Sequence, residues 1–83
     1  MAYHETGYGA SLESIREVWA ATTFLCLTKG SCTIREIHTM SGVSSTSVVT
    51  KSLRALVQLG YIGRGAKDRA RTWNVIVPFM EVI

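Results

Sequence analysis

Residues 41–60 read SGVSSTSVVTKSLRALVQLG, and their chemical character changes along the stretch. Small and hydroxyl-bearing side chains dominate residues 41–50 and Lys51 follows them, whereas Leu53, Leu56 and Leu59 give the rest of the stretch its apolar character before Gly60. Ser44 or Ser45 is suited to cap a helix, and Gly60 is suited to end one. The apolar residues recur at helical spacing: Val49, Leu53, Leu56 and Val57. The stretch therefore predicts a helix with a polar N-terminal part and a buried C-terminal part.

The residues just before this stretch predict a second, shorter helix. Thr33 and Glu36 have the spacing of a capping box, in which each side chain satisfies a backbone amide at the helix start. The helix should span about 34–41 and end at Gly42. Two helices joined by a turn of three or four residues that contains glycine are typical of a helix-turn-helix.

A longer helix is expected from a cap at Ser11 to about Thr28, where Lys29 and Gly30 form a basic last turn and a C-terminal glycine. Its buried stripe should contain Leu12, Ile15, Val18, Trp19, Thr22, Leu25 and Cys26. After Gly60, the runs YIGR and RTWNVIV flank GAKDRA, which predicts a two-stranded hairpin with a basic tip. The expected fold is mainly α with a small antiparallel β-hairpin, a winged helix-turn-helix with a three-helix core and a wing.

The chain has 83 residues, of which 47% are hydrophobic and 18% charged, which is typical of one folded domain. We expect a flexible N-terminal arm over 1–10 and a single domain over 11–83 with an apolar C-terminal tail. No apolar run is long enough to span a membrane and MAYHETGYGA lacks the features of a signal peptide, so we expect a cytoplasmic protein.

Motif spacing predicts neither an enzyme nor a cofactor or metal site. Cys26 and Cys32 lie six positions apart without a second Cys/His pair, which favours reduced structural thiols over a disulfide or a redox switch. His38 is expected to pack between helices or lie partly exposed, and Trp19 and Trp73 are expected in the core.

The positive charge is concentrated in one segment. Residues 42–75 contain six basic residues and one acid, a net charge of +5, whereas the whole chain carries +3. A basic face of this kind is either solvated or contacts a polyanion such as DNA.

The stretch TIREIHTMSGVSSTSVVTKSLRALVQLGYIGR, residues 33–64, resembles the winged helix-turn-helix domain of the LexA repressor family. The spacings from Gly42 to Leu53 and from Gly42 to Gly60 carry much of the resemblance, together with the apolar skeleton. LexA continues into a self-cleaving peptidase domain that nothing in this sequence supplies, so autoproteolysis is not implied. His38 also departs from the family, which usually has a small residue at that position.

The resemblance implies that base-facing residues lie in the first half of the third helix: Ser45, Ser47, Val48, Thr50 and Lys51. Their chemistry fits, because hydroxyls can donate or accept at base edges, valine can meet a thymine methyl and lysine can reach guanine O6 or N7. The alternative is that Ser44 or Ser45 only caps the helix. Backbone contacts are expected from Arg54 and from the wing residues Arg64, Lys67, Arg69 and Arg71, although the wing could also be a solvated turn.

The expected function is sequence-specific binding of double-stranded DNA by a small transcriptional regulator, a repressor. The alternative is a winged helix that mediates protein interactions or forms part of a replication or partition machine, because fold alone does not fix function.

We also expect a homodimer, since apolar residues of the first helix and of the tail would otherwise form an exposed patch. The expected interface contains Phe24, Leu27, Phe79, Met80 and Ile83. The alternative is that the tail folds back on the first helix of its own chain.

Overall fold

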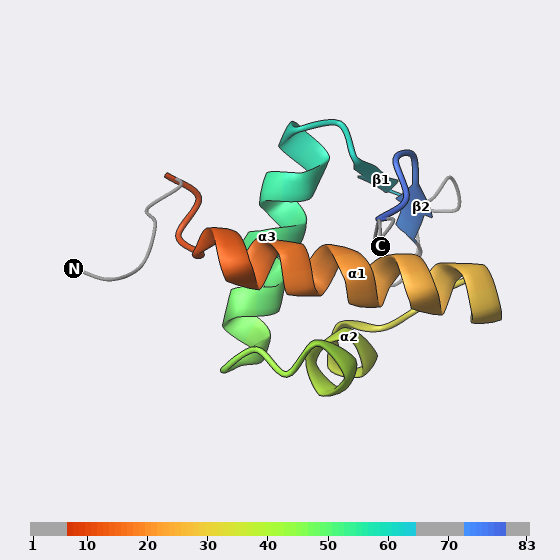
Figure 1. The fold of residues 1–83 in the computed structure, drawn as a ribbon, viewed down its shortest axis with the longest axis horizontal. Coiled ribbons are helices and arrows are strands. Elements are labelled where there is room, and N and C mark those ends of the chain that lie inside the picture. The colour runs from red at the N-terminus through yellow and green to blue at the C-terminus, as the bar shows by residue number, and fades with distance from the viewer. Residues whose placement is uncertain (1–6, 65–72, 80–83) are drawn as a thin grey trace, which may run out of the picture.

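The computed structural model describes residues 7–64 and 73–79. They form three helices followed by two short strands, as Figure 1 shows. The elements are α1 (Leu12–Lys29), α2 (Ile34–Ser41), α3 (Thr46–Gln58), β1 (Ile62–Arg64) and β2 (Trp73–Val75). The strands pair antiparallel, with Gly63 opposite Asn74. The predicted mainly helical fold with a small antiparallel sheet is therefore confirmed. No helix in these ranges is both long enough and apolar enough to cross a membrane.

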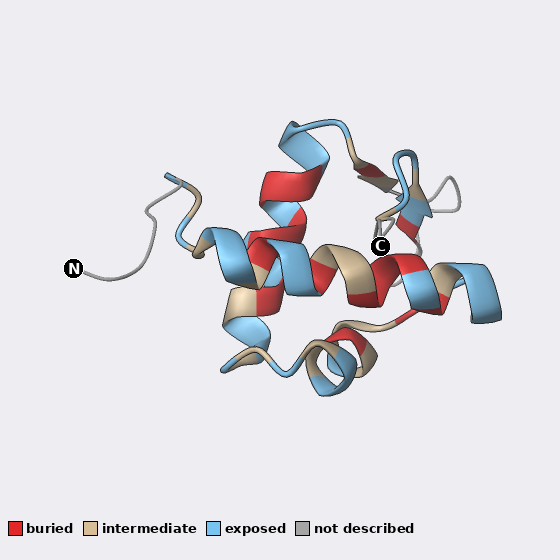
Figure 2. Cartoon of the chain, in the orientation of Figure 1, coloured by how far each residue is buried: buried red, intermediate tan, exposed pale blue. Residues whose placement is uncertain are grey.

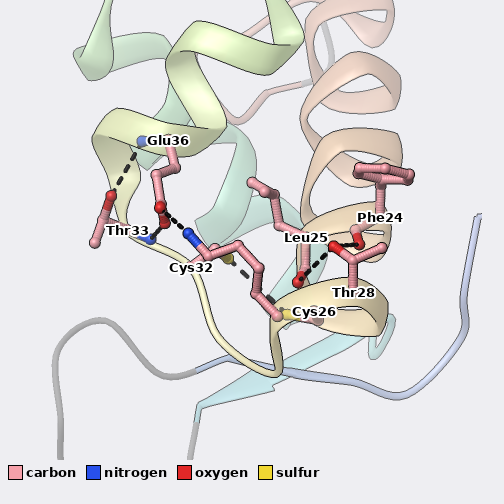
Figure 3. A network of polar contacts seen from close by, with 8 residues as sticks. Phe24, Leu25, Cys26, Thr28, Cys32, Thr33 and Glu36 are labelled. Atoms are coloured by element: carbon pink, nitrogen blue, oxygen red, sulfur yellow. Dashed lines mark hydrogen bonds and ion pairs between the residues drawn. The ribbon is translucent and has the colours of Figure 1, made fainter.

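Local signals at the ends of α1 and α2 set their boundaries as the sequence predicted. The Ser11 side chain accepts a hydrogen bond from the Ser14 amide at 3.1 Å, and Gly30 ends α1 in the left-handed region at φ 84°. At the start of α2, Thr33 and Glu36 form both bonds of the capping box, at 3.0 and 2.9 Å (Figure 3). Each bond satisfies an amide that the first helical turn leaves without a backbone partner.

Glu36 also holds the two helices together, because its carboxylate pairs with Lys29 at the end of α1 (Figure 3). The Lys29 ammonium, followed by the hydrogen bond from the Thr33 amide, lowers the pKa of the Glu36 carboxyl. The pair is exposed, so we assign it a role in orientation rather than a large contribution to stability.

The turn between α2 and α3 begins with Gly42, whose φ of 74° requires the left-handed region. Ser45, rather than Ser44, caps α3 by accepting a hydrogen bond from the Val48 amide at 3.3 Å. At the other end, the Tyr61 amide donates to the Leu56 carbonyl and the Gly60 amide to the Val57 carbonyl. These two bonds form a Schellman motif, which ends the helix at the predicted Gly60.

The core lies between α1, α2 and α3 and is closed by the two strands (Figure 2). Its fully buried large side chains come from every one of these elements except β2: Val18, Ile37, Val49, Leu53, Leu56 and Ile62. Trp73 of β2 and Ile15 and Leu25 of α1 are also buried, as expected. Leu12 differs from the prediction, because its side chain is 47% exposed in the first turn of α1.

β2 is shorter than the expected strand over RTWNVIV. Regular pairing ends at Val75, because the amides of Ile76 and Val77 both donate to the single carbonyl of Tyr61, at 2.9 and 3.0 Å. The chain bends there and turns toward α1. Residues 71 and 72 of the expected strand lie outside the described part of the chain.

The chain after β2 packs on α1 of the same molecule. The Trp19 indole N–H donates to the Val77 carbonyl at 2.8 Å, and the Phe79 amide donates to the Thr23 hydroxyl at 3.1 Å. The Trp19 ring lies between Tyr61 and Phe79, with centroid distances of 4.7 and 5.1 Å. Trp19 is therefore a packing residue, as predicted, and it fixes the start of the tail to α1.

Candidate nucleic-acid interface

Helix α3 has two faces of opposite character. Its buried face, formed by Val49, Ser52, Leu53, Ala55 and Leu56, packs into the core. Ser47, Thr50, Lys51 and Arg54 are exposed and recur at intervals of three and four residues, so they form one stripe along the helix. We call these four residues the outer face of α3. Four of the residues expected to contact DNA are thus brought together on one surface.

The hydroxyls near the start of α3 differ in how they are used. The Ser45 oxygen accepts the capping hydrogen bond from the Val48 amide, so Ser45 caps α3, and its contact with a base stays a prediction. The Thr50 hydroxyl donates to the Thr46 carbonyl at 3.1 Å and keeps its oxygen lone pairs for an external donor. Ser47 is exposed and has no protein partner within the described residues, so its hydroxyl can donate or accept. Val48 is half-buried beside them.

The electrostatic character of this surface follows from its composition. Residues 42–64 contain no Asp or Glu. Within the part of the chain that is described, neither Lys51 nor Arg54 forms an ion pair, and the Lys29–Glu36 pair lies at the junction of α1 and α2. The positive charge of the outer face is therefore not neutralised by a nearby carboxylate of these segments, which favours contact with an anion.

A groove of about 370 Å³ runs beside the outer face, between α3, α2 and β2. Thr50 and Arg54 of the outer face help to line it, and Leu53, Val57 and Trp73 supply much of its apolar lining. This groove was not predicted from the sequence. The exposed Val57, which lies at the edge of the predicted buried stripe, is the signal that could have indicated it.

The predicted wing residues are only partly described. Arg64 is the last residue of β1, opposite Trp73 of β2. Lys67, Arg69 and Arg71 lie outside the described residues. Their expected contact with a DNA backbone therefore stays a prediction.

A short segment before α1 also reaches the outer face, which sequence reasoning missed. Within Gly7–Ala10, Tyr8 and Ala10 are partly buried against the core. A Cβ atom added to Gly9 would lie 3.1 Å from Cδ of Lys51. The expected flexible arm over 1–10 thus includes residues that pack on the domain, while residues 1–6 lie outside the described part.

The residues expected to form a dimer interface separate into two groups. Phe24 and Leu27 are 54% and 76% exposed near the end of α1. Phe79 is half-buried against Trp19 of its own chain, as the alternative of a folded-back tail requires. Met80 and Ile83 lie outside the described residues.

The two cysteines are adjacent but not bonded. The sulfur atoms of Cys26 and Cys32 are 3.9 Å apart (Figure 3), which agrees with the predicted free thiols. Burial raises the pKa of Cys26, and burial followed by the neighbouring Cys26 raises the pKa of Cys32 to about 12. Thiols of this kind form little nucleophilic thiolate at neutral pH. Among the described residues, no group of three His, Cys, Asp or Glu side chains could hold a metal ion.

Comparison with known proteins does not assign the chain to a family, because no family model, no curated protein and no solved structure matches it significantly. The functional assignment therefore rests on the chemistry of the surfaces described above.

Proposed function

We propose that the protein is a winged helix-turn-helix module that binds double-stranded DNA in a sequence-dependent manner. The observation that carries this proposal is the outer face of α3, where two hydroxyls and two cations project into solvent from a helix whose opposite side is buried. The resemblance of residues 33–64 to the LexA DNA-binding domain supports the same assignment.

In the proposed complex, the first half of α3 enters the major groove. The major groove of B-DNA is wide enough to admit an α-helix. The exposed N-terminal residues of a recognition helix are the ones that reach base edges. Ser47 and Thr50 would exchange hydrogen bonds with base edges, Val48 would meet a thymine methyl, and Lys51 would donate to guanine O6 or N7. Ser45 caps the helix with its oxygen and keeps its hydroxyl hydrogen to donate to a base edge or a phosphate.

We assign the contacts to the sugar-phosphate backbone to Arg54 and to the basic residues of the wing. Arg54 lies one turn further along α3 and is long enough to reach a phosphate at the groove edge. The segment between β1 and β2 supplies Lys67, Arg69 and Arg71 next to Arg64 and would act as the wing. Such contacts fix the position of the protein on the duplex and carry little sequence information.

The alternative is a winged helix that binds another protein or works in a replication or partition machine. The apolar groove with Leu53, Val57 and Trp73 is the feature that favours it. Arg54 and Thr50 also line this groove, however, and the segment 42–64 contains no acid. An anionic partner therefore fits the whole surface better than an apolar peptide does.

Selection of binding sites from a pool of random duplexes tests the proposal. The protein should enrich a motif of a few base pairs per half-site, because one recognition helix contacts only about three or four of them directly. Recovery of duplexes without a shared motif, at an affinity that does not depend on their sequence, would contradict sequence-dependent binding.

We further propose a homodimer formed through the second half of α1, which would allow a repressor to read a palindrome with half-sites roughly 34 Å apart. Phe24 and Leu27 supply the exposed apolar surface, whereas the contact of Phe79 with Trp19 assigns that ring to its own chain.

Sedimentation equilibrium at micromolar concentration tests the dimer. The intact chain should have about twice the protomer mass of 9.1 kDa, and Leu27→Ser should return it to that mass. Leu12→Ser is the matched control, because Leu12 is a 47% exposed leucine at the opposite end of α1. A protomer mass for the wild-type chain, or equal effects of both substitutions, would exclude this interface.

A further inference from the structure

The segment before α1 makes a close contact with the most polar part of the candidate interface. The position of a Cβ on Gly9 lies 3.1 Å from Cδ, 3.6 Å from Cε and 3.8 Å from Cγ of Lys51. Three consecutive carbons of the lysine side chain therefore lie within 3.8 Å of the point that a Cβ on residue 9 would occupy. Such an approach leaves no room for a side chain at this position unless Lys51 moves.

Backbone conformation fixes this contact in place. Gly7 and Gly9 both have positive φ angles, 85° and 84°, which glycine adopts without steric cost. Tyr8 lies between the two glycines and Ala10 follows them, and both are partly buried against the core. Ser11 then caps α1. The segment Gly7–Ala10 is thus anchored at Tyr8 and Ala10, and Gly9 is held against α3 between these two residues.

An exposed lysine normally samples many rotamers, and fixing it in a complex costs conformational entropy. The stem of Lys51 is already restricted on the Gly9 side, so less freedom remains to be lost when its ammonium group binds. Restriction of the stem also limits the directions in which the ammonium group can point. Discrimination between bases depends on such directions, because donors and acceptors lie at fixed positions in the groove.

We propose that Gly9 is a positioning residue for base recognition, holding the stem of Lys51 so that its ammonium group is directed to one base pair. This inference rests on the proposed DNA-binding function, and it adds the N-terminal segment to the determinants of sequence preference. Gly9 itself contacts no base in this proposal and acts only through Lys51.

Two matched substitutions separate the effect of the approach to Lys51 from the effect of placing a side chain at a positive φ. Gly9→Asn and Gly7→Asn place the same side chain at nearly the same positive φ, which asparagine tolerates better than most residues. The two positions differ in their surroundings. A Cβ added at Gly7 has no neighbour within 4 Å, whereas a Cβ added at Gly9 requires the Lys51 side chain to shift by a few tenths of an ångström. Gly9→Ala and Gly7→Ala form a second pair with the smallest possible side chain.

The first measurement uses the free protein. NMR should show cross-relaxation between the Gly9 α-protons and the Lys51 methylenes. The Lys51 side-chain shifts should change in Gly9→Asn and stay unchanged in Gly7→Asn, while both variants keep the backbone shifts of α3. Absence of the Gly9–Lys51 cross-relaxation in the wild type would overturn the inference without any reference to DNA.

The second measurement uses the selected duplex and the duplex altered at the base pair where Lys51→Ala loses its preference. Gly9→Asn should reduce the preference between them by about 3- to 10-fold, a part of what one side-chain contact to a base supplies. Gly7→Asn should match the wild type. If the wild type and Gly9→Asn discriminate equally between the two duplexes, the role of Gly9 is overturned and the proposed DNA binding is not. If the wild-type protein binds no duplex, the proposed function is overturned, and the role of Gly9 in base recognition with it.

Discussion

Leu56→Ala should lower the free energy of unfolding by about 2–5 kcal/mol, the range for truncating a buried leucine and leaving part of its volume empty. Leu56 is fully buried in the core, and its carbonyl also accepts the Schellman hydrogen bond from the Tyr61 amide. A domain of this size has little stability in reserve, so much of the variant should be unfolded at 25 °C. Urea denaturation followed by far-UV circular dichroism measures the change.

Leu59→Ala provides the control on the same helix end. Leu59 is 50% exposed, so its truncation should change the free energy of unfolding by less than about 1 kcal/mol. Similar losses in both variants would mean that the packing of α3 on α1 differs from the structure described here.

Lys51→Ala should reduce the preference for one base pair by about 1–3 kcal/mol and leave the preference at the other positions unchanged. The reason is that one side chain reaches only the base edges next to it. The exposed position of Lys51 also implies that the melting temperature stays close to that of the wild type. Competition binding with single-base variants of the selected duplex measures the effect.

Arg54→Ala is the matched control, because Arg54 is a second exposed cation three positions further along α3. Because Arg54 is proposed to contact a phosphate, its loss should lower the affinity for all duplexes by a similar factor and leave the order of preference among them unchanged. Arg69→Ala should behave in the same way. If Lys51→Ala also lowers the affinity for all duplexes by the same factor, α3 does not read bases.

Much of the fold could be predicted from the sequence, because its boundaries are set by local chemistry. The capping box at Thr33, the cap at Ser11 and the glycines after each helix act over one turn of chain. Hydrophobic spacing then identified the buried faces of α1 and α3, since a period close to 3.6 residues places those side chains on one side.

The remaining features depend on contacts between residues far apart in the sequence. β2 ends early because the Tyr61 carbonyl accepts two amides, and the position of Phe79 depends on the Trp19 ring 60 positions earlier. The approach of Gly9 to Lys51 is of the same kind. The residues of the outer face were predicted as candidates, whereas their neighbours from other segments were not.

We propose that the basic segment 42–75 binds duplex DNA, and equilibrium titrations with one duplex at several salt concentrations measure this binding. If five or six phosphates are neutralised per protomer, a plot of log K against log salt concentration should have a slope of about −4.5 to −5.4. A slope near zero with every duplex tested would contradict the account and remove DNA as the partner of this surface.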